Sequence, residues 1–217
     1  MARKTIIEEG EYYHVYNRGV DKRIIFERDQ DYQRFIAMLH LCNSTKPVEY
    51  RLSDGYGGLT SVQIPDKERI VAIGAYALMP NHFHLLLREI CAGGIAKFMQ
   101  KLSTGYTMYF NLTRDRNGSL FQGSFKAQHS DSDEYLKYLF SYIHLNPVEL
   151  ARANEDRTKF LLSYPYSSYQ DFLGKTRAHA IILNKSEFPD YFSTQEDFEH
   201  NINDWLANRP QDFNTEV

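Results

Sequence analysis

Residues 75–88 read AYALMPNHFHLLLR, and this stretch decides the fold prediction. A Pro-Asn pair in its middle is typical of a turn, and apolar runs lie on both sides of that pair. We therefore predict two strands, over residues 69–78 and 82–89, that pair in antiparallel fashion.

The second of these strands carries His82 and His84. Side chains two residues apart in a strand point to the same face, so the two imidazoles share one face and Phe83 takes the other. Two neutral imidazoles on one side of a rigid strand form half of a divalent-metal site. Their spacing falls short of the common zinc signatures, and both side chains could instead be hydrogen-bonded core residues. Burying two imidazoles without partners is costly, which keeps metal binding open.

The same patterns extend along the rest of the chain. The predicted strands span residues 11–18, 69–78, 82–89 and 119–129, and a bend at Gly123 in the last of them stays open. The predicted helices span residues 29–42, 95–112, 131–146 and 194–208. Residues 43–68 are rich in Gly and Pro, which predicts a loop or an irregular hairpin. The order of these elements predicts the α+β class, with a ferredoxin-like antiparallel sheet flanked by helices.

Charge is distributed unevenly along the 217 residues. Residues 186–217 contain eight acidic side chains and one basic side chain, a net charge of −7, whereas residues 1–185 contain 24 basic and 20 acidic side chains, a net charge of +4. A mildly basic body with an acidic extension permits phosphate binding without requiring it. The 16 Tyr and 14 Phe suit a packed core and also stacking on unpaired bases.

The cellular compartment is suggested by the cysteines and the N-terminus. Cys42 and Cys91 lack metal-ligand spacing, as expected in a reducing cytoplasm. The N-terminus lacks the apolar core of a signal peptide, and no stretch is long and apolar enough to cross a membrane. We expect a cytoplasmic protein without a membrane partner.

The predicted 131–146 helix places Tyr138, Tyr142 and Asn146 four residues apart, on one face. The tyrosines could be the core stripe of an amphipathic helix, and the Asn could simply end it. If this face instead packs on the histidines, two ring nitrogens and an amide oxygen surround a divalent cation beside a phenol. A cation such as Mg²⁺ or Mn²⁺ would polarise a phosphodiester for attack by the tyrosine.

Four segments resemble the IS200-like single-tyrosine transposases of the HUH endonuclease superfamily, and most closely their REP-associated branch. The segments are residues 79–86 (MPNHFHLL), 142–148 (YIHLNPV), 13–19 (YHVYNRG) and 118–126 (GSLFQGSFK). They occur in the family's order. The resemblance predicts a single-tyrosine transposase domain at residues 1–155, with the HUH palm fold. The family core does not need residues 156–217, and we expect these residues to form an acidic, helical C-terminal extension that packs on the core.

The resemblance also implies residue roles. His82 and His84 would be metal ligands, Tyr142 the nucleophile, and Asn146 the amide ligand. The implied substrate is single-stranded DNA beside an imperfect hairpin. Cleavage with Mg²⁺ or Mn²⁺ would leave a 5′-phosphotyrosine and a free 3′-OH. Relatives act as monomers or homodimers, and both states stay open for this chain.

Several residues and functions compete with this interpretation. Tyr106 and Tyr109 are alternative nucleophiles on another helix, where packing explains them better. His14 either approaches the site from the neighbouring strand or merely packs. The candidate phosphate contacts, each of which could equally be solvated surface, are Arg18, Lys22, Arg23, Lys97, Lys101, Arg114, Arg116 and Lys126. The alternative functions are a module that binds hairpin DNA or RNA without cutting it, and a metal hydrolase that uses water.

Overall fold

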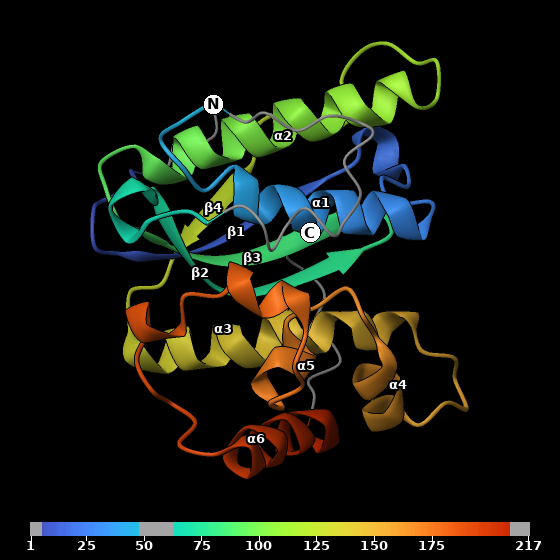
Figure 1. Ribbon diagram of the computed structural model, residues 1–217. Coiled ribbons are helices and arrows are strands. Elements are labelled where there is room, and N and C mark those ends of the chain that lie inside the picture. Colours follow the sequence, from blue (N-terminus) through green and yellow to red (C-terminus); the bar gives the residue numbers. More distant parts are fainter. Residues whose placement is uncertain (1–5, 48–62, 209–217) are drawn as a thin grey trace.

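The computed structural model describes residues 6–47 and 63–208, and its centre is a four-stranded antiparallel sheet (Figure 1). The strands are β1 (Tyr12–Arg18), β2 (Val71–Met79), β3 (His82–Glu89) and β4 (Lys126–His129). Their order across the sheet is β2-β3-β1-β4. This arrangement confirms the predicted ferredoxin-like antiparallel sheet and places the histidine strand β3 between β2 and β1.

Strand register fixes which side chains are neighbours. In the β1–β3 pairing, Tyr16 lies opposite His84 and Arg18 lies opposite His82. The β2–β3 pairing shifts register between Ile73 and Ala75. Successive side chains alternate between the two faces of a strand. An irregularity of this kind therefore changes which face the side chains beyond it point to.

Helices cover both faces of the sheet (Figure 1). On one face lie α1 (Asp29–Leu41) and α2 (Gly94–Leu112). On the other lie α3 (Asp133–Leu145), α4 (Arg157–Ser163), α5 (Tyr169–Phe172) and α6 (Gln195–Ala207). Short 3₁₀ turns are η1 (Val20–Lys22), η3 (Asp66–Glu68), η4 (Asn146–Leu150), η5 (Ala178–Ile182) and η6 (Lys185–Glu187). All four predicted helices are present, whereas α4 and α5 were not predicted.

The predicted strand over residues 119–129 is wrong in its first half. Only Lys126–His129 forms β4, and Phe121 makes an isolated bridge to Gly19. Gly118 and Gly123 both have positive φ, +90° and +84°, so the chain turns twice before it can join the sheet. Residues 48–62, within the predicted 43–68 loop, lie outside the described residues.

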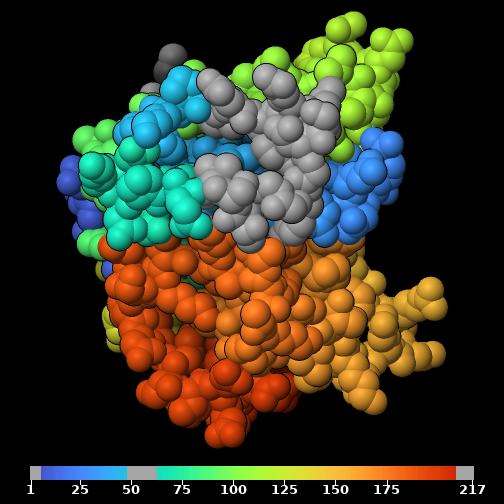
Figure 2. All heavy atoms as spheres, in the orientation of Figure 1, coloured from blue at the N-terminus to red at the C-terminus, as the bar shows by residue number. Residues whose placement is uncertain are grey.

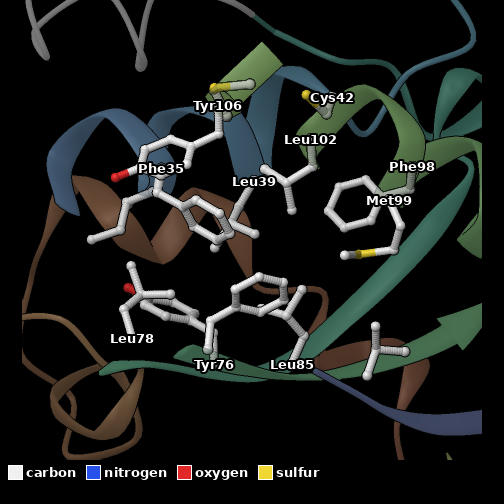
Figure 3. Close-up of a cluster of buried hydrophobic side chains, with 14 of the residues drawn as sticks. Phe35, Leu39, Cys42, Tyr76, Leu78, Leu85, Phe98, Met99, Leu102 and Tyr106 are labelled. Atoms are coloured by element: carbon white, nitrogen blue, oxygen red, sulfur yellow. The ribbon is translucent and has the colours of Figure 1, made fainter. Parts of the chain in front are cut away.

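The larger apolar core fills the space between the sheet and the α1–α2 layer (Figure 3). Phe35 and Leu39 from α1 meet Phe98 and Leu102 from α2, above strand residues such as Leu85. Each such side chain stabilises the fold by about 1.5–3 kcal/mol through burial. Phe83 belongs to the same cluster. The histidines that flank it therefore face the opposite layer.

A second apolar cluster lies beneath the sheet and includes α3. Small side chains of β2, Ala72, Ala75 and Ala77, leave room for the larger residues of α3. Leu161, Tyr169, Phe188, Phe198 and Ile202 join this cluster from the C-terminal segment. Helix α3 is thus packed between the sheet and residues beyond 156.

The C-terminal segment also covers the outer edge of β2. The Leu78 amide donates to the Tyr166 carbonyl, and the amides of Ser168 and Asn184 donate to carbonyls of the strand, each at 2.9 Å. A covered edge cannot pair with a second chain. In Figure 2 the segment, coloured orange to red, forms the lower half of the visible face. Within the described residues, no helix has both the length and the apolar character that a membrane span requires.

Candidate active site

Three histidines and one tyrosine meet between β1, β3 and α3. The Tyr142 ring lies edge-on to the rings of His14 and His84, with centroid distances of 5.4 and 5.7 Å. The His82 ring lies 5.0 Å from that of His84. The structure therefore brings the two histidines of β3 and the tyrosine of α3 to one place, between the sheet and the helix.

The imidazoles of β3 are buried and uncharged at neutral pH. His84 is fully buried and His82 is 8% exposed. Burial, together with a smaller effect of the nearby Arg18 guanidinium, lowers the pKa of His82 to about 4. Burial lowers the pKa of His84 well below its ordinary value, with smaller effects from His14 and His82. A neutral imidazole keeps the nitrogen lone pair that a metal requires.

The ring nitrogens have defined partners. His82 Nδ1 lies 2.7 Å from the Oδ1 of Asn81, and His84 Nδ1 lies 2.8 Å from the Nε2 of His14. His84 Nε2 is buried and finds no hydrogen-bond partner in the part of the chain that the structure describes. A buried ring nitrogen left in this way is a suitable donor for a cation.

Asn146 ends α3, one turn after Tyr142. Its Nδ2 donates to the Tyr142 carbonyl at 2.8 Å, so the amide is held by its nitrogen. The amide oxygen, Oδ1, is a type of ligand that hard cations bind. Among the described residues, no three His, Cys, Asp or Glu side chains are arranged to hold a metal ion. Two imidazoles and an amide oxygen fit a divalent cation whose other ligands are water or phosphate oxygens.

The competing tyrosines of α2 lie across the sheet from this site. The Tyr106 hydroxyl donates to the Ile25 carbonyl at 2.6 Å, and the Tyr109 hydroxyl donates to Asp31 Oδ1 at 2.9 Å. Burial, with that carboxylate nearby, raises the pKa of Tyr109 to about 12. These contacts agree with a packing role for both.

Four of the predicted phosphate contacts lie at the end of the sheet that carries His82. Arg18 pairs with that residue across the strands, and Lys22 and Arg23 follow β1 directly. Lys126 Nζ lies 5.5 Å from the Tyr16 ring centroid, and that ring stacks on both His14 and His84. These positive charges therefore lie near the candidate site.

The other four predicted contacts lie on α2 or just beyond it, across the sheet from Tyr142. They are Lys97, Lys101, Arg114 and Arg116. Arg114 forms ion pairs with Glu27 at 2.9 Å and with Asp31 at 2.6 Å, and little of its side chain is exposed. Lys101 donates to two backbone carbonyls near the end of α1. Arg116 donates to Asn111 Oδ1 and to the Ser119 carbonyl, both at 2.6 Å. The structure does not bring these four to the histidines.

His14 is the site residue that sequence reasoning left undecided. It is fully buried, and burial lowers its pKa to about 3. The sequence feature that could have indicated a site role is its place in a buried strand, two residues before Tyr16 and therefore on the same face of that strand. The decisive fact, that β1 lies next to β3, depends on strand order and not on local pattern.

A segment of the chain matches a known protein family. Residues 62–146 match the family model described as "Transposase IS200 like". This segment belongs to the IS200-like transposase family. The match contains His82, His84 and Tyr142 and ends at Asn146. Membership of this transposase family implies a divalent metal.

One solved structure resembles the whole fold. It is a REP-associated tyrosine transposase bound to a REP hairpin, with a TM-score of 0.51 and 10% sequence identity. The likeness covers 89% of this chain and 91% of that one. At this identity it shows a shared α+β fold. No curated protein sequence matches the chain.

Proposed function

We propose that this IS200-like protein is a metal-dependent single-stranded DNA endonuclease and strand transferase with Tyr142 as its nucleophile. The observation that supports this most directly is the edge contact of the Tyr142 ring with His84, 5.7 Å between centroids, inside the segment that matches the family. A phenol beside two neutral imidazoles is the arrangement that tyrosine attack on a phosphodiester needs.

The proposed step conserves atoms and charge. Tyr142 Oη bonds to the phosphorus, and the bond from phosphorus to the 3′ oxygen breaks. The proton lost by the phenol is balanced by one that the departing 3′ oxygen gains. The products are a 5′-phosphotyrosine and a free 3′-OH. Because one phosphate ester replaces another, the strand can later be rejoined without ATP.

His82, His84 and Asn146 would hold Mg²⁺ or Mn²⁺, which stabilises charge on the phosphate oxygens when bound. The other requirements fall to the chain itself. Burial of Tyr142, which is 2% exposed, keeps water away from the phenol. The bond from the Asn146 amide to the Tyr142 carbonyl keeps amide and phenol on one helix face.

We propose single-stranded DNA beside an imperfect hairpin as the substrate. The solved structure that resembles this chain is bound to a REP hairpin. Arg18, Lys22, Arg23 and Lys126 would hold the phosphates, because they lie at the His82 end of the sheet. Such contacts predict binding that weakens as salt rises. Arg114 is less suited, since its charge is already paired within the protein.

An adduct assay tests the proposal. The protein is incubated with labelled, hairpin-bearing single strands and Mg²⁺ or Mn²⁺, and SDS-stable protein–DNA adducts are counted. We expect an adduct from the unaltered protein, none from Tyr142→Phe, and a greatly reduced amount from His82→Ala. Tyr138→Phe is the matched control, because Tyr138 lies on the same helix and its ring packs against Tyr142 and Trp205.

The same assay separates the alternatives. Cutting without an adduct identifies a hydrolase that uses water. Hairpin binding without cutting identifies a binding module. Either result, or an adduct that survives Tyr142→Phe, contradicts the proposed nucleophile.

A further inference from the structure

In each of the two candidate ligand histidines, a side chain of another residue lies within hydrogen-bond distance of the ring nitrogen Nδ1. For His82 that residue is Asn81, whose Oδ1 lies 2.7 Å from His82 Nδ1. For His84 it is His14, whose Nε2 lies 2.8 Å from His84 Nδ1. The two contacts therefore repeat one arrangement with two different side chains.

The Asn81 contact fixes the tautomer of His82. The Asn81 Nδ2 donates to the Lys22 carbonyl at 3.3 Å, which orients the amide with its oxygen toward the imidazole. An amide oxygen only accepts, so His82 Nδ1 must carry the proton. The lone pair of a neutral His82 then lies on Nε2.

The contact between His14 and His84 allows two proton arrangements. If His84 Nδ1 donates to His14 Nε2, the lone pair of His84 lies on its Nε2. If His14 Nε2 donates instead, His84 Nε2 carries a proton and cannot bind a cation. His84 Nε2 and His14 Nδ1 are both buried and have no hydrogen-bond partner among the described residues. Only in the first arrangement does His84 Nε2 keep a lone pair that can bind a cation.

We propose that His14 and Asn81 are positioning residues that hold His84 and His82 in the Nδ1–H tautomer, so that both Nε2 lone pairs face a divalent cation. This inference rests on the proposed function, because it assigns the cation to that site. Acceptors behind ligand imidazoles commonly fix tautomer and ring orientation in metal sites. His14 is fully buried, and a hydrocarbon side chain in its position would leave the buried Nδ1 of His84 without this hydrogen-bond partner.

The first test needs neither substrate nor variant. Nitrogen-15 correlation spectra of the metal-free protein report which ring nitrogen of each histidine is protonated. We expect Nδ1–H for both His82 and His84. Protonation of His84 at Nε2 overturns the inference for His14, whatever the adduct assay shows.

The second test measures Mn²⁺ affinity by titration calorimetry or electron paramagnetic resonance. Changing His14→Phe keeps the ring and removes the acceptor, and we expect affinity to fall by about 10- to 100-fold. His14→Gln places an amide oxygen where Nε2 lies, and most of the affinity should return. For His82, Asn81→Leu should weaken binding and Asn81→Asp should preserve it.

His129→Gln is the matched control, because His129 lies on β4 and bonds to Glu11, away from both ligand imidazoles. It should leave Mn²⁺ affinity unchanged. Equal losses in His14→Phe and His14→Gln overturn the positioning role, since a direct ligand or a packing residue would respond in that way. Normal Mn²⁺ binding and tautomers without any DNA adduct would reject the proposed function and leave this inference standing.

Discussion

Gly74 shows how one missing side chain determines a tertiary contact. A Cβ atom built at this position would lie 2.7 Å from two ring carbons of Phe188. That ring packs against Tyr12 and Phe140, at centroid distances of 5.3 and 5.8 Å. The Gly at the register shift of β2 therefore allows the C-terminal segment to lie directly on the sheet.

A Gly74→Ala substitution should destabilise the fold. The added methyl group must displace the ring of Phe188 in a packed cluster, at a cost of roughly 1–3 kcal/mol. Urea unfolding followed by circular dichroism measures the change. In a Phe188→Leu background the same substitution should cost less, because the two residues are in contact. Equal costs in both backgrounds would contradict the proposed clash.

Residue-scale prediction succeeds where the information is local. The alternation of His82, Phe83 and His84 along one strand is enough to predict their faces, and Tyr142 and Asn146 follow from helical spacing. Arg114 could not be understood in this way, because its partner Asp31 lies 83 residues away in the sequence. The partner of His84 likewise depends on which strand lies beside β3.

The start of α2 is held by a carboxylate from the preceding strand. Glu89, the last residue of β3, is fully buried, and its two oxygens accept from the amides of Gly93, Gly94 and Ile95. These amides have no partners within the helix, and a negative charge suits the positive end of the helix dipole. One side chain therefore ties the histidine strand to the helix that covers its other face.

Glu89→Ala should weaken this connection. Three amides, two of them in the buried residues Gly94 and Ile95, would lose a charged acceptor, and we expect the free energy of unfolding to fall by about 2–3 kcal/mol. Glu187→Ala is the comparison, since it removes a half-exposed carboxylate paired with Arg88 and should cost less than about 1 kcal/mol. Equal losses in chemical denaturation would show that the cap contributes no more than a surface ion pair.

Element-scale prediction depends on length and period. Long helices such as α2 and α3 repeat their apolar residues over several turns, which makes the pattern distinct. Helices α4 and α5 have seven and four residues, too few to show a period. The first half of the predicted 119–129 strand has the composition of a strand, but glycines with positive φ turn the chain away.

At the scale of the whole molecule, the C-terminal segment is part of the packing around the site. It covers the outer edge of β2 and packs on α3, the helix that carries Tyr142. The family match ends at residue 146, so these contacts come from outside the matched segment. The division of the chain at residue 155 stays a prediction. Loss of the segment would expose both the strand edge and the outer face of α3.

His179 joins the C-terminal segment to the sheet and should make the fold sensitive to acid. Its Nδ1 lies 3.4 Å from the Tyr76 hydroxyl, and burial lowers its pKa to about 4. An unfolded chain takes up this proton as the pH falls through about 6.5, whereas the folded chain takes it up only near its lower pKa. Stability is therefore present above about pH 6.5 and lost as the pH falls toward 4.

A His179→Gln substitution removes this titration. Between pH 7 and pH 5 the unfolding free energy of the variant should fall by about 2 kcal/mol less than that of the unaltered protein. Urea unfolding at several pH values gives both curves. His200→Gln is the control, because the His200 side chain is exposed on α6 and should leave the pH dependence unchanged. Parallel curves for His179→Gln and the unaltered protein would mean that burial of His179 does not govern this part of the acid response.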